Sequence, residues 1–213
     1  MPDGRPFAPQ YASVRHRDET AELGMWVFIA TEVLLFGGLI LSYFVYRHGY
    51  PKAFMAASGR TDILIGTANT AILLTSSFLV ACAVEAFAAR VRTISRACLV
   101  GAAVLGLCFI VLKGMEYRDE YREHLVPGID FSFSEPLADG VQLFFVFYFV
   151  ATALHAVHML IGITVLGIFA VRIHNAAESR TQAALHSAAL YWHFVDVVWI
   201  FLFALIYLPG RSS

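Results

Sequence analysis

The segment Leu23–Tyr46, LGMWVFIATEVLLFGGLILSYFVY, decides the fold of this chain. Glu32 is the only Asp, Glu, Lys, Arg or His within it. At about 1.5 Å of rise per residue, about 20 apolar residues in a helix cross a lipid bilayer, so this segment is long enough to span one. A carboxylate at that depth costs about 2.5–3.5 kcal/mol on insertion scales, which makes Glu32 the first candidate functional residue.

Four further apolar runs extend this pattern over the chain. The sequence is 59% hydrophobic and 15% charged, with a mean hydropathy of +0.68, which is typical of a membrane protein and not of a water-soluble domain. The runs are continuous rather than alternating, which favours helices over barrel strands. We predict an all-α integral membrane protein, a bundle of five transmembrane helices over residues 23–46, 63–84, 97–115, 141–171 and 187–208.

The remaining segments complete a single predicted membrane domain. Residues 1–22 form a polar N-terminal segment and residues 209–213 a tail, and no cleavable signal peptide is recognised because the first apolar run is too long for one. Gly49–Asp62 is predicted to be a loop, with Thr61 or Asp62 capping the second helix. Five spans put the termini on opposite sides. Eight basic residues on the N-terminal side against seven on the other place the N-terminus in the cytoplasm by a narrow margin.

The connection Lys113–Gly140 is the largest predicted extramembrane segment. It carries seven Asp or Glu residues against three Lys or Arg residues. Its beginning, Met115–Leu125, has charges spaced as on the surface of a helix. Two interpretations stay open for this acidic segment, a surface that attracts a basic partner and a solvated loop, of which the solvated loop is the commoner.

Five ionisable residues are predicted to form the functional site: Glu32, His155, His158, His193 and Asp196. Counted from the cytoplasmic end of each span, they lie about 9 to 24 Å deep at helical rise. The two histidines of the fourth span are three residues apart, as are the histidine and the aspartate of the last span, so each pair shares a helix face. We predict that three helices bring these side chains into one buried hydrogen-bonded cluster, with Tyr191 and Trp192 as candidate further members.

Several kinds of site fit such a cluster. Two histidines and two carboxylates could ligate a metal, but di-iron sites draw ligands from four helices and use Glu-x-x-His motifs, which the chain lacks. A haem between His158 and His193 is not supported by any Cys-x-x-Cys-His attachment motif. We therefore expect no metal or haem on this chain. A proton relay through Glu32 or Asp196 and a purely structural cluster both stay open.

The last predicted span carries the most specific motif of the chain, YWHFVDVVW at residues 191–199. This motif closely resembles the final helix of subunit III of the haem–copper oxidases. Stretches similar to the other helices of that family precede it, in the family's order: Gly24–Val33 with Glu32, Asn69–Ser77, Glu116-Tyr117, and Thr152–Gly162 with His155 and His158. The resemblance covers nearly everything from Gly24 to Leu208, and the chain is identified as a member of this family.

The resemblance implies a non-redox core subunit of a bacterial terminal oxidase, enzymatic only within a proton-translocating cytochrome c or quinol oxidase complex. It implies partners in subunits I and II, which hold the haem and copper, together with bound phospholipid and a place in the bacterial inner membrane. No nucleic-acid partner is expected. Family members support proton uptake into subunit I, and Glu32 matches the glutamate linked to that role. The seven-helix members have two further N-terminal helices around a lipid-filled cleft, which is not carried over to this chain.

Two alternative functions stay open on the sequence. The first is an accessory membrane protein of a nitric oxide reductase, which would share the same fold. The second is a small proton-coupled transporter that uses Glu32 and Asp196. Such a transporter is expected to show an inverted repeat or broken helices, and neither pattern is visible in the sequence.

Overall fold

A computed structural model describes the chain except for residues 1–13, 129–130, 132, 134–136, 174–177 and 212–213. All regular structure in the described part is helical: α1 (Val14–Gly49), α2 (Pro51–Ser58), α3 (Ile63–Ala88), α4 (Arg92–Arg122), α5 (Ala138–Arg172), α6 (Glu178–Tyr207) and a 3-10 turn, η1 (Pro209–Arg211). Five of these helices are long and apolar enough to cross a membrane, namely α1, α3, α4, α5 and α6. The predicted five-helix membrane bundle is confirmed.

The boundaries differ from the predicted spans at two places that matter for the site. α4 continues to Arg122, whereas the predicted span ends at residue 115. The predicted loop over Gly49–Asp62 is wrong in its first part, because α2 occupies it with Pro51 in the first turn, where a missing N–H group is tolerated. The predicted cap of the next helix is confirmed for Asp62, whose Oδ1 accepts hydrogen bonds from the backbone N–H groups that open α3.

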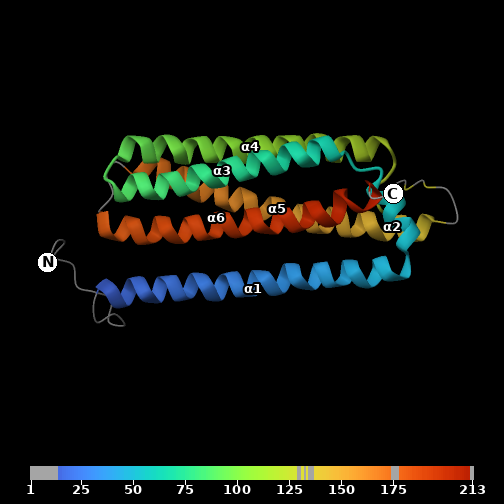
Figure 1. The fold of residues 1–213 in the computed structure, drawn as a ribbon, viewed down its shortest axis with the longest axis horizontal. Coiled ribbons are helices and arrows are strands. Elements are labelled where there is room, and N and C mark those ends of the chain that lie inside the picture. The colour runs from blue at the N-terminus through green and yellow to red at the C-terminus, as the bar shows by residue number, and fades with distance from the viewer. Residues whose placement is uncertain (1–13, 129–130, 132, 134–136, 174–177, 212–213) are drawn as a thin grey trace.

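Four helices, α3 to α6, pack side by side along most of their length, and α1 lies along one side of them (Figure 1). The contacts of α1 are with α5, α6 and the short α2. In the most apolar window of α1 only 11% of residues are buried inside the chain, compared with 50% in that of α6. The apolar side chains of α1 therefore face mainly outward, where the membrane or another subunit meets them.

Trp192 on α6 fills the middle of this four-helix unit and is fully buried. It fits because Gly106 on α4 and Gly162 on α5 leave room for its ring. A Cβ atom added at Gly106 would lie 2.9 Å from the Trp192 ring, and one added at Gly162 would lie 2.8 Å from it. Small residues at such crossings let membrane helices approach closely, and here they set the spacing of α4, α5 and α6.

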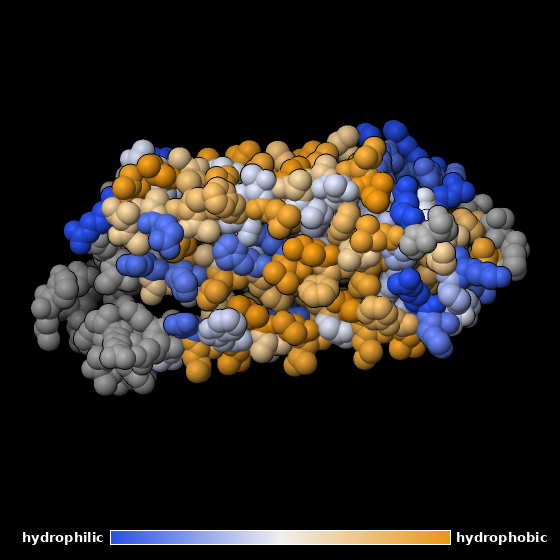
Figure 2. Space-filling model, viewed as in Figure 1, coloured by the Kyte–Doolittle hydropathy of each residue, from blue (hydrophilic) through white to orange (hydrophobic). Residues whose placement is uncertain are grey.

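The end of the bundle that carries α2 and η1 is closed by hydrogen bonds from Ser58. Its hydroxyl donates to the Ile206 carbonyl oxygen at 2.6 Å and accepts from the Gly210 N–H at 3.1 Å. The guanidinium of Arg211 donates to the Thr61 carbonyl oxygen. In Figure 2 hydrophobic residues cover much of the visible face, while hydrophilic residues gather most densely at this end. The C-terminal turn thus holds the α2–α3 connection over the end of α4.

Candidate functional site

Glu32 and His158 are the two predicted site residues that contact each other. Glu32 Oε2 on α1 lies 3.0 Å from His158 Nε2 on α5. The other ring nitrogen of His158, Nδ1, lies 2.8 Å from the carbonyl oxygen of Leu154. Because a carbonyl only accepts, Nδ1 carries a hydrogen, and one further proton is shared between Nε2 and the carboxylate. Tyr191 donates its hydroxyl hydrogen to the His158 carbonyl oxygen at 2.9 Å, which fixes α6 against this turn of α5.

His155 lies one turn from His158 but does not join that pair. Its side chain is buried, and neither ring nitrogen has a hydrogen-bond partner among the described residues. The ring packs against Phe109 and Trp199, with centroid separations of 5.5 and 5.2 Å, and these two rings also contact each other. In this structure His155 is part of an aromatic cluster in the core of the four-helix unit.

His193 and Asp196 share a face of α6, as predicted, but that face turns toward α3. His193 Nδ1 lies 2.6 Å from the Ser77 hydroxyl oxygen. The Asp196 carboxylate is buried near the same serine, and neither of its oxygens accepts a hydrogen bond among the described residues. On the same side, the Trp192 indole N–H donates to the Ser76 hydroxyl at 3.0 Å.

The prediction of one hydrogen-bonded cluster is therefore wrong in its connectivity. Among the described contacts, Glu32 and His158 form one group with Tyr191, and His193 forms a second with Ser77. The reason is geometric: sequence separation gives the depth of a residue and which neighbours share its face, whereas the direction of that face depends on how each helix is rotated in the bundle. The α5 and α6 faces in question point to different neighbouring helices.

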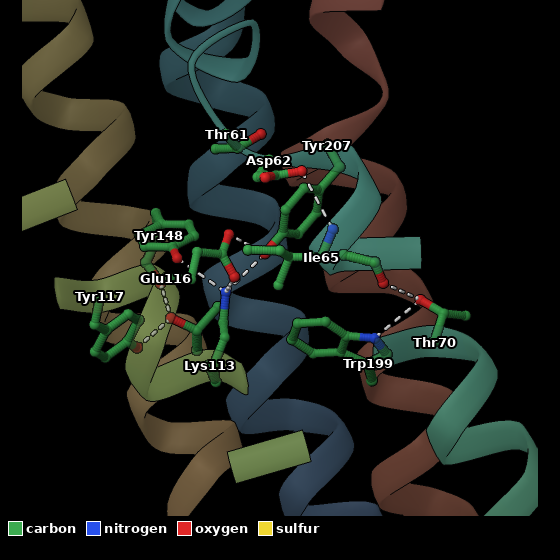
Figure 3. A network of polar contacts seen from close by, with 12 residues as sticks. Thr61, Asp62, Ile65, Thr70, Lys113, Glu116, Tyr117, Tyr148, Trp199 and Tyr207 are labelled. Atoms are coloured by element: carbon green, nitrogen blue, oxygen red, sulfur yellow. Dashed lines mark hydrogen bonds and ion pairs between the residues drawn. The ribbon is translucent and has the colours of Figure 1, made fainter. Parts of the chain in front are cut away.

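A second polar centre lies where the sequence predicted an extramembrane segment (Figure 3). Lys113 on α4 is buried and donates to Glu116 Oε2 at 2.9 Å, to the Tyr148 hydroxyl at 2.9 Å and to the Tyr207 hydroxyl at 2.7 Å. The Tyr207 hydroxyl in turn donates to Glu116 Oε1 at 2.6 Å. All three ammonium hydrogens and both carboxylate oxygens are thus engaged, and the network ties α4 to α5 and α6.

The same turns of α4 carry two more polar side chains that point into the bundle. The Tyr117 hydroxyl pairs with the Thr152 hydroxyl on α5. Glu120 is 6% exposed, and neither of its carboxylate oxygens has a hydrogen-bond partner among the described residues. Its polar neighbours are Lys113 and Tyr148. Three charged side chains of α4 are therefore enclosed beside two tyrosines.

The sequence does contain the signal for this centre, in the spacing of three charged residues. Lys113, Glu116 and Glu120 follow one another at intervals of three and four residues, which places them on one face of a continuing helix. The net acidic composition of the whole segment instead favours a solvated loop. The α4 helix in fact turns this face inward, and the residues that face outward on the same turns are Arg118 and Asp119.

The two polar centres differ in what they can do chemically. The Lys113 centre is a closed ion pair, for which loss of one partner is costly because a charge stays buried without compensation. The Glu32–His158 pair holds a proton at a contact between helices that is partly open, with side chains 14% and 10% exposed. Among the described residues no three His, Cys, Asp or Glu side chains are grouped so that they could share a metal ion.

Comparison with known proteins gives a consistent set of relatives. The family model described as "Cytochrome c oxidase subunit III" matches residues 13–211. The cytochrome c oxidase subunit 3 of Pisaster ochraceus is 31% identical over 195 residues, which cover 88% of this chain and 69% of that protein. A probable quinol oxidase subunit 3 of Staphylococcus aureus is 26% identical over 196 residues, covering 92% of each protein, and its Staphylococcus epidermidis counterpart is 25% identical over the same length.

Proposed function

Because the chain belongs to the cytochrome c oxidase subunit III family and is a subunit III of a haem–copper oxidase, we propose that it is a non-redox core subunit that supports proton uptake by the catalytic subunit. The observation that carries this proposal is the Glu32–His158 pair. A carboxylate and an imidazole that share one proton inside a membrane helix pair can accept or release it with little rearrangement.

The position of the pair supports this role. Glu32 comes from α1, the helix with the fewest buried residues in its apolar window, so the pair lies close to a surface that another subunit or lipid covers. His158 comes from α5, whose other contacts anchor it in the four-helix unit. His158 thus holds the pair in place from α5, while Glu32 on α1 lies on the side from which protons can reach the pair.

The proposed partners are subunits I and II of the same complex, which would hold the haem and copper. The outward apolar side chains of α1, such as Leu34 and Leu41, are suited to contact phospholipid or a membrane subunit. The proposed location is the inner membrane of a bacterium, in which the five long helices span the bilayer with the N-terminus in the cytoplasm. The Staphylococcus relatives, which match over 92% of both proteins, support a bacterial setting.

Co-purification tests the assembly. The tagged chain, extracted from native membranes in mild detergent, is expected to bring down haem-containing subunits, detected by absorption spectroscopy of the eluate. A haem-free homo-oligomer as the only recovered species would contradict the proposal.

Enzyme lifetime tests the proton-support role. In the purified complex, Glu32→Gln is expected to leave the haem content and the initial rate of O2 consumption unchanged and to shorten the period over which turnover continues. Glutamine keeps the shape of the side chain but cannot carry the exchangeable proton. Thr31→Ala, on the exposed adjacent position of α1, is the matched control and should not change the lifetime. An unchanged lifetime in Glu32→Gln would refute the role.

A further inference from the structure

A pocket of about 530 Å³ opens at the end of the bundle, between the α2–α3 connection, the last turns of α4 and Arg211. Its lining is strongly acidic, with five carboxylates against two arginines: Asp62, Glu116, Asp119, Glu120 and Glu123, against Arg60 and Arg211. Figure 3 shows Asp62 and Glu116 near one another, just beyond Lys113. None of this pocket belongs to the Glu32–His158 pair.

The carboxylates of the pocket are not equivalent. Asp62 Oδ1 accepts hydrogen bonds from the first backbone N–H groups of α3, and Glu116 accepts hydrogen bonds from Lys113 and Tyr207. Asp119 is exposed and lies 3.5 Å from Arg118. Glu120 is different, because it is more than nine-tenths buried, lines the pocket and has no hydrogen-bond partner among the described residues. Its carboxyl group lies close to the Tyr148 hydroxyl, and within the described part of the chain it makes no ion pair.

The charged groups around Glu120 do not satisfy it. Lys113 is nearby, but its three hydrogens go to Glu116, Tyr148 and Tyr207. Arg211 donates to the Thr61 carbonyl oxygen. A buried carboxyl group without a partner is unfavourable in its charged form and tends to take up a proton, and a cation that reaches it through the pocket stabilises the carboxylate instead.

The size and the ligands of the pocket favour an organic cation. A single water needs only about 10–15 Å³ of such space, so the pocket admits a whole side chain rather than one bare ion. A directly ligated metal would need several protein ligands together, and no three His, Cys, Asp or Glu side chains in the described part of the chain are grouped in this way. A guanidinium or an ammonium needs only one or two carboxylates, and a guanidinium can bind one of them through two parallel hydrogen bonds.

The segment of the chain that follows α4 does not supply the cation. The segment that follows α4, residues 125–140, contains no Lys or Arg and adds three further carboxylates, those of Asp130, Glu135 and Asp139. By sequence, therefore, this segment adds negative charge and no positive charge. Of the two interpretations that the acidic segment allowed, attraction of a basic partner is the one that the pocket and the buried Glu120 favour.

We propose that this pocket receives an arginine or lysine side chain from another subunit of the oxidase complex, with Glu120 as its buried partner and Glu123 at the rim. The proposal rests on the proposed function in that it needs a multisubunit complex. It adds a specific docking point at the α2/η1 end of the bundle, separate from the apolar outer face of α1.

Site-specific photocrosslinking in the purified complex tests this. The photoreactive residue p-benzoylphenylalanine is placed at position 123, at the pocket, and in a control at position 118, which is exposed on the same helix but does not line the pocket. We expect position 123 to crosslink to a peptide of another subunit that contains Arg or Lys, identified by mass spectrometry. Adding Glu120→Gln should lower that yield roughly tenfold, because an enclosed charge pair is lost, and should leave any crosslink from position 118 unchanged.

Three results would overturn the inference: crosslinks from position 123 to lipid alone, crosslinks to a peptide without Arg or Lys, or a yield that Glu120→Gln does not change. Yields are normalised to the haem recovered in each sample, so that loss of assembly is not mistaken for loss of docking. If the unmodified chain recovers haem and the crosslink fails, this inference fails while the proposed function stands. If the unmodified chain recovers no haem, the proposed function itself fails.

Discussion

The Lys113 centre and the Glu32–His158 pair are both buried ionic contacts between membrane helices, yet their surroundings differ. Lys113 and Glu116 have side chains 4% exposed and lie among α4, α5 and α6, where every donor and acceptor of the pair is engaged. Glu32 and His158 are 14% and 10% exposed and join α1, the least enclosed helix, to α5. The enclosed pair is suited to fix helix positions, and the more open pair is suited to exchange a proton with its surroundings.

The largest expected effect comes from removing one partner of the enclosed pair. Lys113→Met should lower the free energy of unfolding by about 3–5 kcal/mol, because Glu116 is left buried without its cation. The measurement is the thermal denaturation of the purified complex. Lys52→Met, on the exposed surface of α2, is the control and should be close to neutral. Equal effects of the two substitutions would contradict the structural role of the Lys113 ion pair.

Replacing both partners should be less harmful than replacing one. In Lys113→Met/Glu116→Leu no uncompensated charge remains from the pair, and buried ion pairs are often exchanged for apolar residues at little cost. We expect about half of the loss to be recovered, since the hydroxyls of Tyr148 and Tyr207 still lose their partner. Additive losses from the two single substitutions would show that the pair contributes through packing alone.

An intermediate effect is expected from the glycines beside Trp192. In Gly162→Ala the new methyl group would lie 2.8 Å from the Trp192 ring, so α5 and α6 must shift, at about 1–3 kcal/mol. In Gly167→Ala, on the same helix, the methyl group meets nothing within 4 Å, and stability should hold. Thermal denaturation of the two variants side by side checks whether the four-helix unit is as tightly packed as its geometry indicates.

The smallest effect on stability is expected at the open pair. Glu32→Gln should change the free energy of unfolding by roughly 0.6 kcal/mol, a typical value for a hydrogen bond between membrane helices. Its consequence should appear in the lifetime of the working enzyme instead. A stability loss as large as that of Lys113→Met would mean that Glu32 has a structural role and would reverse the comparison.

The sequence predicts which residues of α1 and α5 are polar and buried, but not which partner each of them contacts. Glu32 and His158 were predicted as site residues, and the structure brings them together, because a lone carboxylate in an apolar helix has to find a polar neighbour. His155, predicted on the same grounds, instead packs against Phe109 and Trp199. The two histidines are the same residue type and lie one turn apart on the same helix. What separates them is which side chains of the neighbouring helices each one meets.

The interpretation of the charged segment after residue 112 as a solvated loop is wrong for three of its side chains. That interpretation follows from the rule that isolated ions are rarely buried. Lys113, Glu116 and Glu120 are nevertheless buried. Their burial is possible because the hydroxyls of Tyr148 on α5 and Tyr207 on α6 accept hydrogen bonds from the Lys113 ammonium group. Those tyrosines are 35 and 94 residues away from Lys113 along the chain, so no local sequence pattern predicts these hydrogen bonds.

The sequence by itself determined the class of the protein, the number of its membrane helices and the family. Each of these follows from composition, the length of apolar runs or a local motif, which act along one helix at a time. Tertiary structure alone decided which polar groups meet: Glu32 with His158, His193 with Ser77, and Lys113 with Glu116 and two tyrosines. The physical reason is that a hydrogen bond between helices depends on their rotation and spacing, and these are set by the packing of side chains such as Trp192 against Gly106 and Gly162.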